Sequence, residues 1–213
     1  MRITKFGQCC LLIEVGGKRI LTDPGRFSTS QNTVTDIDLI LITHEHADHL
    51  HSDSVRVILQ NNPQAEVITN TSVGKVLTDM GVTFTVLEGR ATGTHADTLI
   101  EAFDGEHVEI IDDYGIVQNT GYFIANKLFY PGDAYTNPEK SVPVLALPVA
   151  GPWCKAADAI RYAVAVKPVK AFPVHDAVLS ESGIALTHGL FGGQLDQVNI
   201  EFVPLKNDES AEF

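Results

Sequence analysis

Cysteine is scarce in this chain, which has three cysteines among 213 residues. They are Cys9, Cys10 and Cys154, and they make no disulfide framework. We therefore expect buried structural thiols in a reducing compartment, with the cytoplasm as the default location. A nucleophilic role for Cys154 is the weaker alternative, because nothing in the sequence shows how the pKa of its thiol would be lowered.

Long apolar runs and an excess of positive charge are also lacking. The apolar stretch near the N-terminus is broken by Gln8 and Glu14, so it is too short for a signal-peptide core or a membrane span. The 27 Asp and Glu residues outnumber the 15 Lys and Arg residues, and the resulting net charge of −12 disfavours nucleic acid and anionic membranes as partners. A small-molecule substrate is the expected partner, and the sequence leaves a homo-oligomer open.

No segment rich in Pro, Gly or Ser divides the chain. We therefore predict a single domain over residues 1–206 and an acidic, frayed tail over residues 207–213. Short apolar segments bounded by turn residues predict strands, and amphipathic segments with capping and stop residues predict helices. Strands are expected at 2–6, 9–15, 18–22, 38–43, 66–70, 83–87, 98–103, 107–111, 121–125, 127–130, 144–148 and 169–174, and helices from Ser52 or Asp53 to Asn61, at 72–80, at 155–166 and, broken at Gly192-Gly193, at 180–195.

The two halves of the chain contain the same device. A strand, a tight turn, a second strand and an aspartate follow one another from Leu12 to Asp23 and again from Gly121 to Asp133. Two β-rich halves with helices outside predict an α+β fold in which two sheets pack face to face and are covered by helices. The predicted architecture is a four-layer αββα sandwich with two pseudo-repeated halves, and the metal-type residues fall at its strand ends.

A cluster of histidines forms the most informative motif of the sequence. It follows Leu39–Ile42, an apolar run too short for a helix and rich in β-branched residues, so it begins where a buried strand ends. His44 and His46 project the same way from an extended backbone, and Asp48 and His49 offer a second ligand pair after the turn. Imidazole and carboxylate are ligands that zinc accepts, and also manganese and iron, so the motif predicts a metal site.

The pattern His44-x-His46-x-Asp48-His49 after an apolar strand resembles the signature of the metallo-β-lactamase superfamily of metal-dependent hydrolases. The resemblance spans residues 2 to about 186. Within the superfamily, the sequence most resembles the small single-domain branch that includes ascorbate-6-phosphate lactonase-like proteins. The stretches that carry this narrower likeness are Gly121-Tyr122, Pro131-Gly132-Asp133, Leu147–Trp153 and Pro173–Asp176.

The resemblance implies a set of metal ligands. In the superfamily, a downstream histidine completes the first metal site, a Gly-Asp after a hairpin bridges two metals, and a later histidine completes the second site. His107, Asp133 and His175 match these residues in type, order and context. The implied centre holds two divalent ions, with Zn2+ favoured and Mn2+ or Fe2+ as alternatives. Its ligands would be His44, His46 and His107 at site one, Asp48, His49 and His175 at site two, and Asp133 as the bridge. The catalytic residues would be Asp48 and His49, and Asp48 would also accept a proton.

Other residues compete for roles near such a centre. His95, in a turn-rich segment, is the alternative to His107 as the third ligand of site one. Asp23 resembles the early aspartate of the superfamily and is expected to hold a ligand imidazole by its other N–H. Asp176 is as well placed to cap the following helix as to act at the metal. We expect His188 at the surface, His51 near the site without ligating, and Trp153 and Tyr135 in the pocket wall or in packing.

The sequence thus predicts a dinuclear metal-dependent hydrolase in which a metal-bridging hydroxide cleaves an ester, lactone, amide or phosphoester bond of a small molecule. One alternative is an iron-dependent redox enzyme. Superfamily members that reduce oxygen at two irons have a glutamate where this chain has His46 and need a flavin domain, whereas a persulfide dioxygenase keeps the histidine motif. The other alternative is a non-catalytic metal-binding scaffold, against which the open dinuclear ligand set argues. Fold likeness does not identify the substrate.

Overall fold

The computed structural model describes residues 1–112, 114 and 116–213. In this part of the chain the strands form two seven-stranded sheets, with the orders β14-β1-β2-β3-β4-β5-β6 and β13-β12-β11-β10-β9-β8-β7. The first sheet comprises β1 (Arg2–Gly7), β2 (Cys10–Val15), β3 (Lys18–Thr22), β4 (Leu39–Leu41), β5 (Glu66–Thr69), β6 (Thr85–Val86) and β14 (Glu209–Glu212). The second comprises β7 (Thr92–His95), β8 (Thr98–Glu106), β9 (Gln118–Ile124), β10 (Leu128–Tyr130), β11 (Val144–Pro148), β12 (Lys170–Val174) and β13 (Glu201–Phe202).

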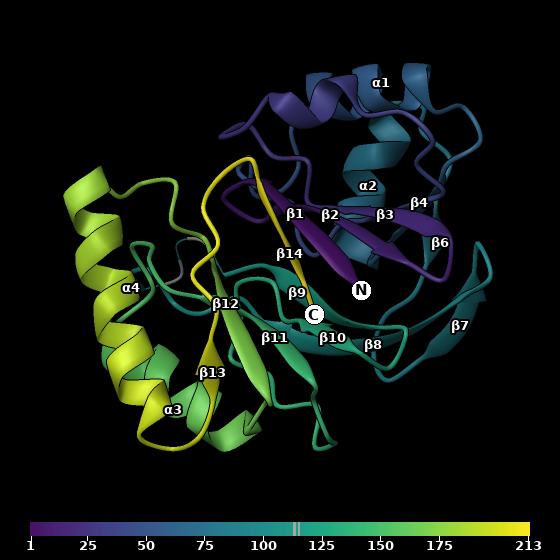
Figure 1. Cartoon of the computed structure of the whole chain (residues 1–213). Helices are drawn as coiled ribbons and strands as arrows, with labels where there is room; N and C mark the ends of the chain where they lie inside the picture. Colours follow the sequence, from purple (N-terminus) through teal and green to yellow (C-terminus); the bar gives the residue numbers. More distant parts are fainter. Residues whose placement is uncertain (113, 115) are drawn as a thin grey trace.

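Helices cover the outer face of each sheet. Figure 1 shows α1 (Ser52–Asn61) and α2 (Thr71–Asp79) over the first sheet, and α3 (Ala156–Val166) and α4 (Glu181–Asp196) over the second. A short 3₁₀ helix, η1 (Ser30–Thr33), precedes β4. Within the described residues, every helix is too short or too little apolar to cross a membrane.

Three apolar clusters fill the spaces between these four layers. Strand β4 shows how they arise, because its residues are apolar on both faces. Leu39 and Leu41 enter the cluster between the two sheets, whereas Ile40 packs toward α1 and α2. The third cluster joins the second sheet to α3 and α4. The predicted αββα sandwich is therefore confirmed.

The two halves repeat one topology. Strands β2 and β3 form an antiparallel hairpin, and β4, β5 and β6 then add in parallel to β3. In the second half, β9 and β10 form the hairpin, and β11, β12 and β13 add in parallel to β10. Parallel strands end at the same edge of their sheet, so the residues that follow β3 and β4 lie together, as do those that follow β10 and β12.

Four details of the sequence prediction were wrong. Residues 107–111 are not a strand, because β8 ends at Glu106 and the chain then turns so that Val108 N–H bonds the Asp133 carbonyl. Strand β7 was missed in a segment that reads as turns. Helix α4 runs unbroken through Gly192-Gly193. Helix α1 begins after His51 with no side-chain cap, so neither Ser52 nor Asp53 caps it.

The C-terminal segment was also expected to fray, and this was wrong. Residues Glu209–Glu212 form β14, which pairs antiparallel with β1. The Met1 ammonium also donates a hydrogen bond to the Phe213 carbonyl at 2.9 Å, and Figure 1 shows the two termini side by side. Backbone pairing along an otherwise open sheet edge holds this acidic segment, which its composition alone does not reveal.

A buried ion pair ties the first strand to the second half of the molecule. The Lys5 ammonium, on β1, is fully buried and donates to Asp176 Oδ1 at 2.6 Å. His188 Nε2, on α4, lies 3.2 Å from the other oxygen of Asp176. Burial would raise the pKa of the Asp176 carboxyl, but the contacts with His188 and Lys5 lower it below its usual value. Asp176 therefore remains ionised, and its carboxylate, which follows β12, contacts both β1 and α4.

Lys5→Ala is expected to destabilise the fold by about 3–5 kcal/mol, because it leaves a buried carboxylate without its ammonium partner. The free energy of unfolding from urea denaturation measures this. Lys170→Ala is the matched control, since the partly exposed Lys170–Glu201 pair should contribute about 1 kcal/mol or less. Equal effects of the two substitutions would contradict this account of Lys5.

Candidate metal centre

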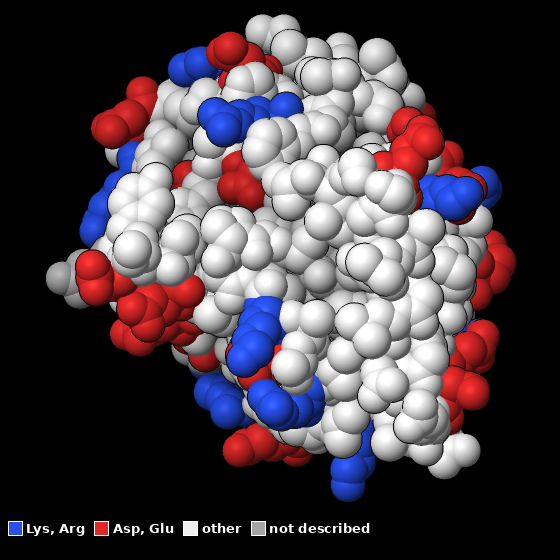
Figure 2. All heavy atoms as spheres, turned by 90° about the vertical axis from the view of Figure 1, so that its left-hand side faces the viewer, with Lys and Arg blue, Asp and Glu red and all other residues white. Residues whose placement is uncertain are grey.

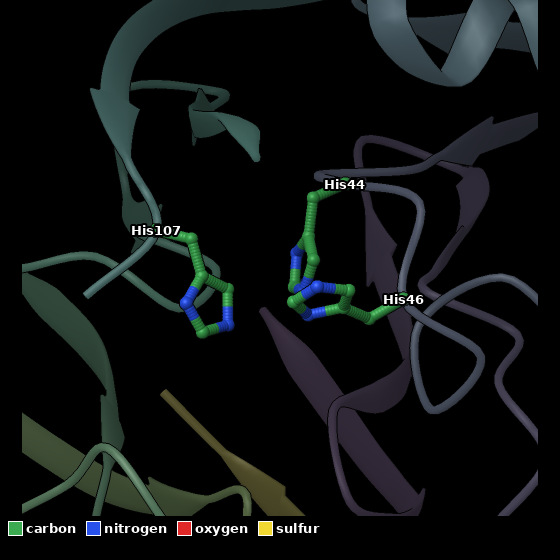
Figure 3. A group of neighbouring side chains, drawn as sticks. All are labelled: His44, His46 and His107. Carbon is green, nitrogen blue, oxygen red and sulfur yellow. The ribbon is translucent and has the colours of Figure 1, made fainter. Parts of the chain in front are cut away.

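The predicted ligand residues come from loops at the ends of strands in both sheets. His44, His46, Asp48 and His49 follow β4, while His107 follows β8, Asp133 follows β10 and His175 follows β12. Figure 3 shows the imidazoles of His44, His46 and His107 directed toward a common point from two sides. The chain repeat thus brings residues 131 positions apart in sequence, from His44 to His175, into one place.

Two groups of side chains with metal-ligand atoms lie next to each other. His44, His46 and His107 form the first group, and Asp48, His49, Asp133 and His175 form the second. In each group the ligand atoms lie within 4.8 Å of one another, a spacing that one ion can span. All seven residues that the sequence singled out are therefore brought together.

The Asp133 carboxylate lies between the two groups. Its Oδ2 is 3.3 Å from His107 Nε2 and 3.8 Å from His44 Nε2, both in the first group. The same oxygen is 2.9 Å from His175 Nε2, and Oδ1 is 3.2 Å from His49 Nε2. The Asp133 carboxylate is thus in contact range of histidines from both groups.

Several of these polar atoms are buried without a hydrogen bond from the described residues. They are His44 Nε2, His49 Nε2, Asp133 Oδ1 and both ring nitrogens of His175. Buried polar atoms normally have a partner, and a cation among the Nε2 and Oδ1 atoms of this set would supply one. The two ring nitrogens of His175 point in different directions, so they cannot share one ion. The donor set, with imidazole nitrogens and carboxylate oxygens only, suits zinc and also manganese or iron.

The charges in the cluster perturb one another strongly. Burial would lower the pKa of His49, but the Asp133 and Asp23 carboxylates raise it well above its usual value. For His175, burial would lower the pKa, but the contacts with the Asp133 and Asp48 carboxylates together raise it to about 9. Burial would raise the pKa of Asp133, whereas His175 and His49 hold it well below its usual range. His44 differs, because burial and the neighbouring His49 both lower its pKa. Asp133 therefore stays ionised among imidazoles.

Asp23 fixes His49, as the sequence predicted. Its buried carboxylate lies 2.7 Å from His49 Nδ1, which directs Nε2 of that ring toward the ligand cluster. The same carboxylate accepts hydrogen bonds from the Thr43 N–H and hydroxyl and from the Tyr130 hydroxyl. Asp23 thus holds a ligand ring, the start of the ligand loop and a strand of the second sheet together.

Asn119 and Trp153 position Asp133. The Asn119 side chain accepts from the Asp133 N–H at 3.0 Å and donates to the Pro131 carbonyl at 2.8 Å. Gly132 between them has φ +66°, and a Cβ there would lie 2.2 Å from the Asn119 side-chain oxygen, so glycine is required. Trp153 Nε1 donates to Asp133 Oδ2 at 3.1 Å. This assigns Trp153, expected in the pocket wall or in packing, a polar contact with the cluster.

Gln8 connects the ligand loops of the two halves. Its side-chain amide donates to Asp48 Oδ2 at 2.9 Å, and its side-chain oxygen accepts from the Ala177 N–H at 3.1 Å. Its backbone carbonyl accepts from the His175 N–H at 3.0 Å. Sequence reasoning missed both Gln8 and Asn119. A single amide side chain in a strand or turn belongs to no recognisable sequence motif. The repeated hairpin before Asp133 was the one sequence feature that pointed to the region where Asn119 lies.

The other candidate residues lie apart from the cluster or act differently. His95 is on β7 beside Glu66 and outside both groups, so among the described residues His107 completes the first group. His51 bonds Ser54 in α1.

Asp176 neither caps α4, which Ser180 caps, nor joins the ligand cluster. His188 is 9% exposed rather than a surface residue, because it packs onto Asp176. Tyr135 lies against Trp153 and bonds Cys154.

The fold and the cluster define a class of protein: an αββα sandwich with a histidine and aspartate centre where its two halves meet. The sequence profile of the β-lactamase superfamily domain matches residues 2–175. The chain therefore belongs to the β-lactamase superfamily, and the expected metallo-β-lactamase-like architecture is confirmed.

Relatives support this assignment. Protein Rv0786c of Mycobacterium tuberculosis is 32% identical, with 99% of each chain covered. A UPF0173 metal-dependent hydrolase of Alkaliphilus metalliredigens is 28% identical over 82% of this chain and 85% of its own length. The crystal structure of YhfI, a metallo-β-lactamase fold protein of Bacillus subtilis, superposes with a TM-score of 0.76 at 14% identity, covering 100% of this chain and 98% of that chain.

Cys154 is expected to be a poor nucleophile. Burial raises the pKa of its thiol to about 11, so almost none is thiolate at neutral pH. Burial also raises the pKa of Cys9 and of Cys10 well above the usual value. Alkylation of the native protein by iodoacetamide at about pH 8 should be roughly 100-fold slower than that of glutathione.

Unfolding in urea should expose all three thiols to rapid alkylation, which controls for reagent quality. Alkylation of Cys154 in the native protein at the glutathione rate would show that its thiol is activated.

Proposed function

We propose that the protein is a metal-dependent hydrolase with a dinuclear centre that cleaves an ester, lactone, amide or phosphoester bond of a small molecule. The observation that carries this proposal is the position of Asp133, whose carboxylate lies within contact range of both ligand groups. A carboxylate so placed would hold two cations close together, and a structural site does not require such an arrangement. Membership of the β-lactamase superfamily and the name of the Alkaliphilus relative support the same activity.

In this proposal His44, His46 and His107 would hold one ion, Asp48, His49 and His175 would hold the other, and Asp133 would lie between them as a shared ligand. Zinc fits the donor set best, with manganese or iron as alternatives. The bound ions supply Lewis acidity, which polarises a substrate oxygen and acidifies a water molecule. Asp48, which is less buried than Asp133, is placed to accept the proton of that water and return it to the leaving group.

The chain's own residues fix the orientation of the ligands. Asp23 orients His49, the Val108 carbonyl accepts from His107 Nδ1 at 2.6 Å, and Gln8 restrains Asp48. The contacts at Nδ1 of His49 and His107 favour the tautomer that leaves Nε2 of these two rings available. The redox alternative and the scaffold alternative use the same ligands, and metal analysis together with an activity panel discriminates among them. A cytoplasmic location and the lack of a nucleic-acid partner stay part of this proposal.

Asp133→Asn tests the bridge. The substitution keeps the shape but removes the charge that would hold two cations close. We expect a fall from about two ions per chain to about one, and a loss of hydrolysis of at least about 100-fold. Elemental analysis and turnover of lactone, thioester and phosphodiester substrates measure these effects.

Asp53→Asn is the matched control, because Asp53 is exposed on α1 and pairs only with Arg56 among the described residues. It should retain full metal content and activity. Full metal content with full activity in Asp133→Asn would reject the bridging role.

Removal of the metal should lower the melting temperature. A ligand that binds only the native state at about 1,000 times its Kd adds about 4 kcal/mol to the free energy of unfolding. For a domain of this size, that corresponds to about 10 °C. Calorimetry with a chelator, and with the same chelator already saturated with zinc as the control, measures the shift. An unchanged melting temperature after confirmed metal loss would refute this coupling.

A further inference from the structure

A cavity of about 700 Å³ opens beside the metal-type cluster. Gln8, His46, Asp48 and His175 form its polar floor. The rest of its lining is largely apolar and comes from Phe27, Ala47, Ile110, Tyr114, Val117, Pro152 and Val178, with one cationic side chain, Arg26. A small molecule that reaches the cluster from this cavity therefore contacts an apolar wall and a single positive charge.

The apolar wall is unusually exposed. Phe27 is 42% exposed, Tyr114 72% and Val178 55%. They come from three separate segments: the loop after β3, the segment between β8 and β9, and the loop before α4. On the side of the molecule where α4 lies, Figure 2 shows a hollowed face with a broad area free of charged side chains. Exposed apolar side chains from three segments that line one opening indicate a site where an apolar ligand binds.

Arg26 adds a charge to this opening. Its guanidinium lies over the Phe27 ring at 5.3 Å, which holds it against the cavity wall. Its backbone N–H bonds the Ala47 carbonyl at 3.0 Å, so Arg26 is anchored next to the loop that bears Asp48. The arginine ion pairs of the described residues involve Arg2, Arg19, Arg56, Arg90 and Arg161, and Arg26 is not among them. In a chain of net charge −12, an arginine so placed favours an anionic group of the ligand.

We propose that the substrate class of this site is a soluble amphiphile with one anionic group. Its hydrolysable acyl bond would lie at the metal-type cluster, its alkyl or aryl body against Phe27, Tyr114 and Val178, and its anionic group against Arg26. The proposal rests on the proposed hydrolase function for the reaction but not for binding. In the reaction, the bond from the carbonyl carbon to the leaving heteroatom breaks, a bond from that carbon to the oxygen of water forms, and the proton of the water passes to the heteroatom.

Binding of alkyl sulfonates to the zinc-loaded protein tests the class without turnover, because sulfonates ligate zinc poorly. The series butane-, hexane- and octane-1-sulfonate, followed by calorimetry, should bind about fourfold more tightly for each methylene that contacts the wall. Octane-1-sulfonate should bind at least about tenfold more tightly than octan-1-ol, because the alcohol lacks the charge for Arg26.

Matched variants identify the contacts. Arg26→Gln should remove the difference between octane-1-sulfonate and octan-1-ol, whereas Arg56→Gln, at an exposed arginine on α1, should keep it. Val178→Ser should weaken the dependence on chain length, whereas Val169→Ser, at an exposed valine before β12, should not. Equal affinity across the sulfonates, or equal effects within either pair of variants, would overturn the proposed class.

Hydrolysis of 4-nitrophenyl octanoate and of the 4-nitrophenyl monoester of octanedioic acid separates this proposal from the proposed function. Metal-dependent turnover with an Arg26-dependent preference for the monoester, seen in KM, supports both. Turnover without that preference would overturn the substrate class alone. Selective sulfonate binding without metal-dependent turnover of any ester would overturn the hydrolase function and leave the ligand class supported.

Discussion

The buried carboxylate of Asp133 is the group on which the arrangement of this protein depends. A lone buried carboxylate is strongly unfavourable, so it must be compensated by positive charge and hydrogen bonds. Here His175 and His49 provide the charge, and the Asp133 backbone is fixed through Asn119. Because these imidazoles come from both halves, the charge of Asp133 is satisfied only when the two sheets are packed together. The same packing that forms the core therefore assembles the metal-type cluster.

Strained backbone marks the places where this assembly is held. Gln8, Asp23 and His175 have φ values of 51°, 36° and 63°, in a region that non-glycine residues rarely adopt. Each of the three makes side-chain or backbone bonds across the centre. Strain of this kind persists only where surrounding contacts over-determine the conformation. The contacts of the fold therefore hold the backbone at these three positions of the cluster.

Periodicity and turn residues located the strand ends before His44, Asp133 and His175, whereas His107 was expected at the start of a strand and instead follows β8. The apolar run before His44 and the paired hairpins are local patterns that predicted the two-sheet fold and the motif His44, His46, Asp48 and His49. His107, Asp133 and His175 were predicted from the resemblance to the superfamily. Gln8, Lys5 and β14 escaped prediction because their partners lie 40, 171 and about 208 positions away. No local pattern encodes such pairings. His188 was predicted at the surface for the same reason, because the sequence does not show that it contacts Asp176.

The clustered histidine and aspartate residues and the cavity wall differ in how readily they can be substituted. Ligand residues are fixed by strand ends and buried contacts, so changing them disturbs the charge balance around Asp133. The cavity wall is built instead from exposed residues outside the helices and main strands, such as Phe27, Tyr114 and Val178. Loops of this kind tolerate substitution far better than the elements that they connect. Substrate choice can therefore change without loss of the cluster, which explains how one αββα scaffold serves many substrates.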